Sequence, residues 1–298
     1  MRVCRKFLLL TGRYGVVFAL LFLVIGGWGC AVKRRVHVSP LQAPGPLKQA
    51  TATELVKKLD AWSGDINTLK ATVEFKPTTG SVYNGVINEY HKVGGFILLK
   101  KPAMIRIIGQ APVVRTDIFD MVSDGQHFRV SIPPKNKFIV GNNSYRASAK
   151  KPLENLRPAH ILDALVIPPV DKTREKFFDE EAQAPGGQFY YVLNVVEPAT
   201  DGELSLKRKV WFNRTELNIS RLQLYGPEGV LVEDINYGNY RDFQGIRYPE
   251  QITLSRPEQD YTLAITIAKA TFNQPIPAKN FILKQPPNAT LVKLGGGE

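Results

Sequence analysis

Apolar and polar residues alternate along most of this 298-residue chain from residue 69 onward. A period of two places successive side chains on opposite faces of a strand, so the pattern predicts β-strands. Turn signals separate these segments, among them Asp124-Gly125 and Pro133-Pro134. The predicted strands span residues 69–75, 82–91, 95–100, 104–108, 116–122, 126–132, 137–140, 188–197, 204–213, 219–225, 230–241, 246–256 and 261–272. We therefore expect a mainly β, antiparallel fold.

Two segments have the helical period instead. Before the first strand, apolar side chains recur at the spacing of one helix face, which predicts a helix over about residues 53–62. Thr51 and Thr53 are both candidate N-caps for this helix. A second helix is predicted over 158–165, because Pro158 suits the first position of a helix. The apolar positions of the first helix are Leu55, Val56, Leu59 and Trp62.

The later strands each predict a buried face. In 204–213 one row of side chains is apolar and the other is polar, as expected for a sheet with one wet face. Arg208 interrupts the apolar row, so it must lie at an opening or be paired inside. So many neighbouring strands rarely stay flat, and they curl into a barrel or fold into two packed sheets.

The first thirty residues have the layout of a secretory lipoprotein signal. Four basic residues precede an apolar run over 16–28, which is shorter than the roughly 20 residues that span a bilayer. Gly29 and Cys30 follow, so we expect cleavage between them and a lipid on the Cys30 thiol. Gly27 and Trp28 depart from the usual lipoprotein pattern, which leaves an uncleaved anchor or ordinary cleavage as alternatives. The predicted signal spans 1–29, and 30–49, which contains Pro and Gly, is a predicted tether.

Composition excludes several kinds of protein. After cleavage one of the two cysteines remains, so neither a disulfide framework nor a thiolate metal site is expected. The net charge of +12 includes four positive charges in the signal, which leaves +8 on the mature chain. These charges are scattered rather than gathered in a stripe, so no nucleic-acid partner is expected. The four histidines lie far apart and no nucleophile elbow or phosphate loop occurs, so we expect neither an enzyme nor a cofactor.

Short motifs occur along the chain in a recognisable order. They are Gly95-Phe96-Ile97-Leu98-Leu99, Ser123-Asp124-Gly125, Trp211-Phe212-Asn213, Tyr248-Pro249-Glu250 and Phe281-Ile282-Leu283. This order resembles that of the LolA/LolB-like outer-membrane lipoprotein-sorting family, over about residues 50–292. The resemblance implies a half-open antiparallel β-barrel of about 11–12 strands with two or three covering helices. Residues 293–298 would then form a flexible tail.

The resemblance also implies a function. A member of this family shields acyl chains in an apolar hollow during passage through the periplasm, so phospholipid or lipoprotein cargo and a periplasmic carrier are the implied partners. Ala31 after the cysteine implies the outer membrane, with the inner membrane as the alternative. The residues that would line the hollow, or else fill a solid core, are Leu204, Leu206, Val210, Phe212, Leu222, Leu224, Leu263, Ile265 and Ile267.

Two alternatives stay open. Pro112, Val113 and Val114 would form a protruding apolar loop, as in the anchored member of the family, or would simply begin the next strand. The whole domain would act as a carrier or as a non-carrier interaction module, either an envelope-assembly scaffold or a stress sensor. A hollow barrel favours the carrier, and a filled barrel favours the module.

Overall fold

The computed structural model describes residues 46–81, 86–145, 155–198 and 202–294. All of them belong to the compact unit Ala43–Glu298. The predicted signal, Gly29, Cys30 and the tether up to residue 45 lie outside the described residues.

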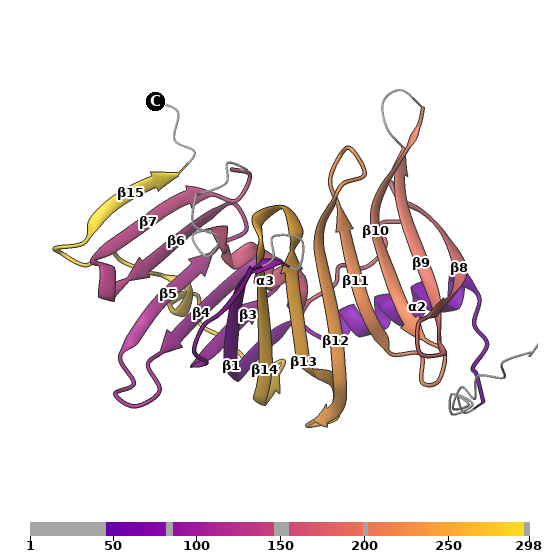
Figure 1. Ribbon diagram of the computed structural model, residues 1–298, viewed down its shortest axis with the longest axis horizontal. Helices are drawn as coiled ribbons and strands as arrows, with labels where there is room; N and C mark the ends of the chain where they lie inside the picture. The colour runs from indigo at the N-terminus through magenta and orange to yellow at the C-terminus, as the bar shows by residue number, and fades with distance from the viewer. Residues whose placement is uncertain (1–45, 82–85, 146–154, 199–201, 295–298) are drawn as a thin grey trace, which may run out of the picture. The chain divides into compact units, whose positions relative to one another are not determined.

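The described residues form one 15-stranded sheet with the order β15-β7-β6-β5-β4-β3-β1-β14-β13-β12-β11-β10-β9-β8, and β2 pairs with β1 off this path (Figure 1). The sheet is open, since its path ends at β15 and β8. The strands are β1 (Thr68–Ser81), β2 (Val86–Glu89), β3 (Val93–Lys100), β4 (Met104–Gln110), β5 (Asp117–Ser123), β6 (His127–Ile132), β7 (Lys137–Asn142), β8 (Lys176–Ala184), β9 (Gln188–Pro198), β10 (Leu204–Asn213), β11 (Ile219–Tyr225), β12 (Leu231–Phe243), β13 (Ile246–Arg256), β14 (Tyr261–Phe272) and β15 (Thr290–Leu294).

Neighbouring strands are antiparallel except β15, which runs parallel to β7. The two halves of the chain meet where β1 pairs with β14, with Leu69 opposite Phe272. The mainly β, open antiparallel fold was predicted correctly, but the expected number of strands was too low. β8 was missed because it is a largely exposed edge strand without an apolar row, and β15 because it is short and pairs across a long sequence separation.

Two α-helices are present in the described part of the chain, α2 (Ala52–Gly64) and α3 (Pro158–Leu165). α2 begins with a capping box, in which the Thr51 hydroxyl accepts from the Glu54 N–H at 3.4 Å and the Glu54 carboxylate accepts from the Thr51 N–H at 2.8 Å. α3 has the predicted bounds, with Pro158 in its first turn. Short 3₁₀ helices lie at η1 (Pro133–Lys135), η3 (Pro257–Gln259) and η4 (Ala278–Phe281). No helix in the described ranges is both long and apolar enough to cross a membrane.

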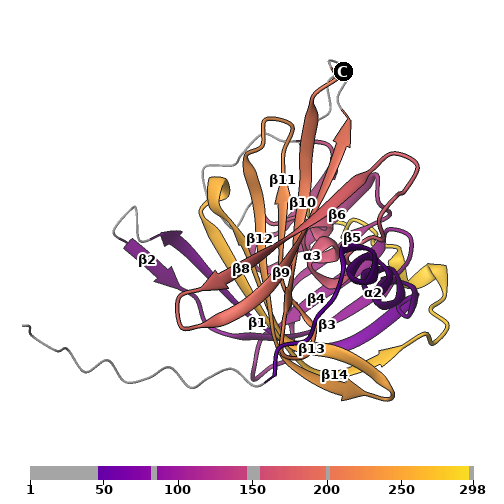
Figure 2. The ribbon, with the colours of Figure 1, turned by 90° about the vertical axis from the view of Figure 1, so that its right-hand side faces the viewer.

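Both helices lie on the same side of the sheet and pack into one hydrophobic core (Figure 2). Trp62 of α2 stacks on Tyr248 of β13, with ring centroids 5.8 Å apart and planes at 3°. Tyr248 in turn contacts Phe272 at 5.2 Å between centroids, and its hydroxyl donates to the Leu165 carbonyl of α3 at 2.5 Å. One buried tyrosine therefore joins the ends of both helices to the middle of the sheet.

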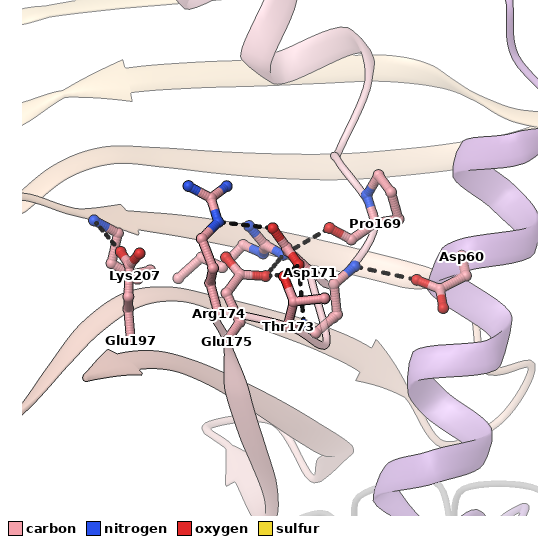
Figure 3. A network of polar contacts seen from close by, with 10 residues as sticks. Asp60, Pro169, Asp171, Thr173, Arg174, Glu175, Glu197 and Lys207 are labelled. Atoms are coloured by element: carbon pink, nitrogen blue, oxygen red, sulfur yellow. Dashed lines mark hydrogen bonds and ion pairs between the residues drawn. The ribbon is translucent and has the colours of Figure 1, made fainter.

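Residues 166–175, which we call the strap, connect α3 to β8 (Figure 3). The Asp60 carboxylate of α2 accepts the Val170 N–H at 3.1 Å. The Arg208 guanidinium donates to the Pro169 carbonyl at 3.1 Å and to the Glu175 carboxylate at 2.9 Å, and Arg208 is buried. The residue that interrupts the apolar row is thus paired inside, where it ties the strap to β10.

Parts of the predicted tether and tail contact the sheet. The Lys48 N–H donates to the Arg214 carbonyl at 2.7 Å, and the Tyr191 hydroxyl donates to the Gln49 side chain at 2.9 Å, so the end of the predicted tether lies against the sheet. At the other end β15 includes Lys293 and Leu294, which were expected to begin the tail.

Candidate functional site

A cavity of about 380 Å³ lies between α3, the residues just before it and the first half of the sheet. Most of its wall is apolar, with a few polar side chains. Such a hollow can hold an apolar group out of water, because the lining offers dispersion contacts and few competing hydrogen-bond partners. The lining residues are Phe75, Pro77, Val93, Ile118, Phe119, Met121, Phe128, Val130, Ile132, Lys135, Lys137, Ile139, Tyr145, Leu156, Arg157, Ile161, Leu263, Val292 and Leu294.

Strand register explains why these side chains converge. Met121 of β5 lies opposite Val130 of β6, and Val130 lies opposite Ile139 of β7. Cross-strand partners share a face of the sheet, so these residues form one apolar row across three strands. Ile161 of α3 contributes to the wall from the helix that covers this face.

Two facing glycines make room for the aromatic part of the wall. Gly95 of β3 lies opposite Gly109 of β4. A Cβ on Gly95 would approach the Phe75 ring to 2.9 Å and the Ile108 carbonyl oxygen to 2.1 Å, and one on Gly109 would approach the Phe119 ring to 2.3 Å. The rings of Phe75 and Phe119 occupy this space, with centroids 6.1 Å apart. Any larger side chain at these glycines would therefore displace the cavity wall.

A cluster of ionisable groups lies between α3 and the sheet. His160 Nδ1 shares a hydrogen bond of 2.8 Å with the Tyr261 hydroxyl of β14. Arg256 forms an ion pair with Glu233, which is 2% exposed. Burial and the nearby Asp163 raise the pKa of Glu233 to about 8, and burial raises the pKa of Asp163 to about 6. Burial also holds the pKa of His160 well below its ordinary value, so this imidazole is neutral near pH 7.

A second hollow of about 310 Å³ lies beside the end of α2 and is more polar. Lys58, Asp65 and Arg247 contribute charged groups to it, and Arg247 forms an ion pair with Glu216 at 2.6 Å. Within the described ranges no three His, Cys, Asp or Glu side chains lie close enough to hold a metal ion. The cavity under α3 is therefore the better candidate for binding an apolar ligand.

The nine predicted lining residues lie in different environments: the cavity wall, the packed core and the surface. Leu263 does line the cavity. Five others are buried in the packed core, namely Val210, Phe212, Leu222, Ile265 and Ile267. Leu206 and Leu224 are partly buried, and Leu204 is 63% exposed at the start of β10, so its prediction as an interior residue was wrong. Leu204 is the first residue of β10, and side chains at a strand end are not buried by alternation alone.

The predicted loop lies in the turn between β4 and β5. Val113 is 88% exposed and Val114 is 69% exposed, and β5 begins only at Asp117. The alternative in which these valines begin the next strand is therefore wrong. The Ala111 N–H donates to the Thr116 carbonyl at 2.9 Å, which closes the turn beneath the two apolar tips.

Sequence reasoning missed most of the cavity wall. The alternating segments 116–122 and 126–132 were recognised as strands, but nothing in their pattern distinguished them from any other buried face. The facing glycines were the available signal, because glycine in a strand interior often marks a close approach by another group.

No family model matches the sequence, and no curated protein is significantly similar to it. A DUF1329 family protein from Desulfovibrio piger matches with a TM-score of 0.54 and 13% identity, over 78% of this chain and 95% of that one. A putative outer membrane lipoprotein-sorting protein domain from Vibrio parahaemolyticus matches with a TM-score of 0.50 and 10% identity, over the same shares. A LolA superfamily protein from Nitrosomonas europaea is 13% identical with a TM-score of 0.49, over 79% and 99%. The first two likenesses show the fold, which is LolA/LolB-like.

Proposed function

We propose that this protein binds acyl chains in the cavity under α3 and takes part in lipid or lipoprotein transport in the cell envelope. The apolar cavity of about 380 Å³ carries the proposal. An acyl chain gains about 0.8 kcal/mol for each methylene that it moves from water into such a lining. The fold supports the proposal, because one neighbour with this fold is described as a putative outer membrane lipoprotein-sorting protein domain.

The proposal places the domain in the periplasm, held at the outer membrane by a lipid on Cys30. It assigns the protein no catalytic role, and a lipoprotein or phospholipid is its cargo. The two exposed valines of the β4–β5 turn suit transient contact with a membrane, because an apolar tip gains free energy when it enters the lipid interface.

The test is photolabelling of the full chain, expressed in a bacterial envelope and kept in its membranes. A neutral monoacylglycerol with a photoreactive group at the end of its chain is added, and labelled peptides are identified by mass spectrometry. We expect label on wall residues such as Phe119, Met121 and Ile161. Val130→Phe adds a ring to the cavity and should reduce labelling several-fold.

Val86→Phe is the matched control, because Val86 is 58% exposed on β2 and lies outside the cavity wall. It should label like the unchanged chain. If the cavity peptides acquire no label, the acyl-chain proposal fails and the interaction module becomes the better account of the fold.

A further inference from the structure

The charged residues on the cavity wall share one sign. Lys135, Lys137 and Arg157 are the ionisable cations among the described lining residues, and none of those lining residues is Asp or Glu. These cations complement the charge of an anionic group on a ligand. Together, the apolar wall and these positive charges indicate a ligand that is apolar at one end and anionic at the other.

The two lysines are exposed and mark where the cavity meets water. Both belong to the turn between β6 and β7, where Lys135 ends η1 and Lys137 begins β7. Asn136 between them has a φ of 50° and its side chain donates to the Asn288 carbonyl at 2.7 Å, while its carbonyl accepts the Thr290 N–H at 2.8 Å. The turn that carries both lysines is thus braced by the segment that leads into β15.

Arg157 brings positive charge deeper into the wall. It is 9% exposed, and its guanidinium carbon lies 5.0 Å from the centroid of the Phe128 ring. Burial lowers the pKa of Arg157, but an arginine remains charged at neutral pH. Cationic side chains therefore extend from the opening inward along the apolar wall.

The size of the cavity limits the number of chains. A volume of 380 Å³ is near the lower end of the roughly 300–1,000 Å³ that ligand sites span. A hollow of this size suits one acyl chain, whereas a triacylated lipoprotein would have to place several chains in it.

We propose that the preferred ligand is an amphiphile with a single acyl chain and an anionic head, whose carboxylate or phosphate is held at Lys135 and Lys137. This proposal rests on the proposed function, since it requires that the cavity take an acyl chain. It adds the chemistry of the head group and the number of chains.

The experiment uses the full chain in bacterial membranes and three probes with the same photoreactive chain. One is a free fatty acid, one is a lysophosphatidylglycerol and one is the neutral monoacylglycerol. We expect the anionic probes to label the cavity peptides roughly fivefold more than the neutral one at equal concentration, the advantage of about one well-placed charge contact. Comparing the two anionic probes distinguishes a carboxylate from a phosphate as the head.

The variants Lys135→Gln and Lys137→Gln, combined in one chain, should reduce anionic labelling to the neutral level and leave neutral labelling unchanged. Lys135→Arg with Lys137→Arg should restore the preference. Lys57→Gln with Lys284→Gln is the control, because both lysines are exposed and lie outside the cavity wall. It should keep the full preference.

Two results would overturn this proposal while the proposed function stood. One is equal labelling by neutral and anionic probes, and the other is a preference that survives the double glutamine variant. If no probe labels the cavity, the proposed function fails and this proposal fails with it.

Discussion

The two halves of the sheet are built from the same kinds of residues. The face under α2 and the strap is packed solid, with a more polar hollow beside the end of the helix, whereas the face under α3 is hollow. Under α2 and the strap, Val210, Phe212 and Leu222 are fully buried against the core. Under α3, residues of the same types line a cavity of about 380 Å³. Strand composition alone therefore does not decide whether a covered face is filled.

The length of the cover differs between the halves. α2 has 13 residues and is about 20 Å long, and the strap extends its cover towards β8. α3 has 8 residues and is about 12 Å long, and it contacts β4, β5 and β13. The contacts of α3 are therefore centred on β4, β5 and β13 rather than on the outer strands β6, β7 and β15. We attribute the cavity to this shorter cover.

The two covers are held by similar means. α2 packs through Leu55, Val56 and Leu59, all buried in the core, and its Asp60 carboxylate accepts the Val170 N–H at 3.1 Å. α3 packs through Ile161 and Leu165, and its His160 shares a hydrogen bond with Tyr261. The way in which the helices are attached therefore does not explain why one half is filled and the other is hollow.

The largest expected difference between the halves is the cost of removing an aromatic ring. Phe212→Ala in the solid half should lower the free energy of unfolding by about 3–5 kcal/mol, because it leaves a cavity in a closely packed core. Phe119→Ala on the cavity wall should cost clearly less, since part of that ring already faces open space. Urea unfolding of both variants measures the two losses. Equal losses would contradict the contrast between a solid and a hollow half.

Adding a ring to the solid half should destabilise the protein less than removing one. Val210→Phe should destabilise the protein by about 1–3 kcal/mol, because Val210 is fully buried and its neighbours must shift. Val130→Phe should be tolerated, since the added ring can enter the cavity. Melting temperatures of the two variants compare the halves directly. A loss at Val130 as large as that at Val210 would mean that the cavity cannot accept one more ring.

The sequence predicted the local structure better than the site. The period-two pattern located most strands, and α3 begins and ends at the predicted residues. Arg208 was recognised as an exception because a charge in an apolar row needs a partner, and the structure supplies Glu175. Val210 and Phe212 were correctly expected to be interior residues.

The position of the hollow could not be predicted in the same way. Lining a cavity and filling a core both require apolar side chains at every second position, so the pattern of a strand is the same in either case. The difference depends on the distance between the sheet and its cover, which is set by α3, the strap and long-range pairing. All nine predicted residues lie in the later strands, and Leu263 alone among them reaches the cavity wall.

The smallest of these effects concerns the cap of α2. Thr51→Ala should lower the free energy of unfolding by about 1 kcal/mol, because the first turn loses the hydroxyl that accepts the Glu54 N–H. Thr53→Ala is the matched control, since Thr53 is exposed inside the helix and alanine is the better helix former, so stability should be unchanged or slightly higher. Because α2 covers the solid half, neither variant should alter labelling of the cavity by an acyl probe. A fall in labelling with Thr51→Ala would show that the two halves are coupled and that the hollow depends on the cover of the solid side.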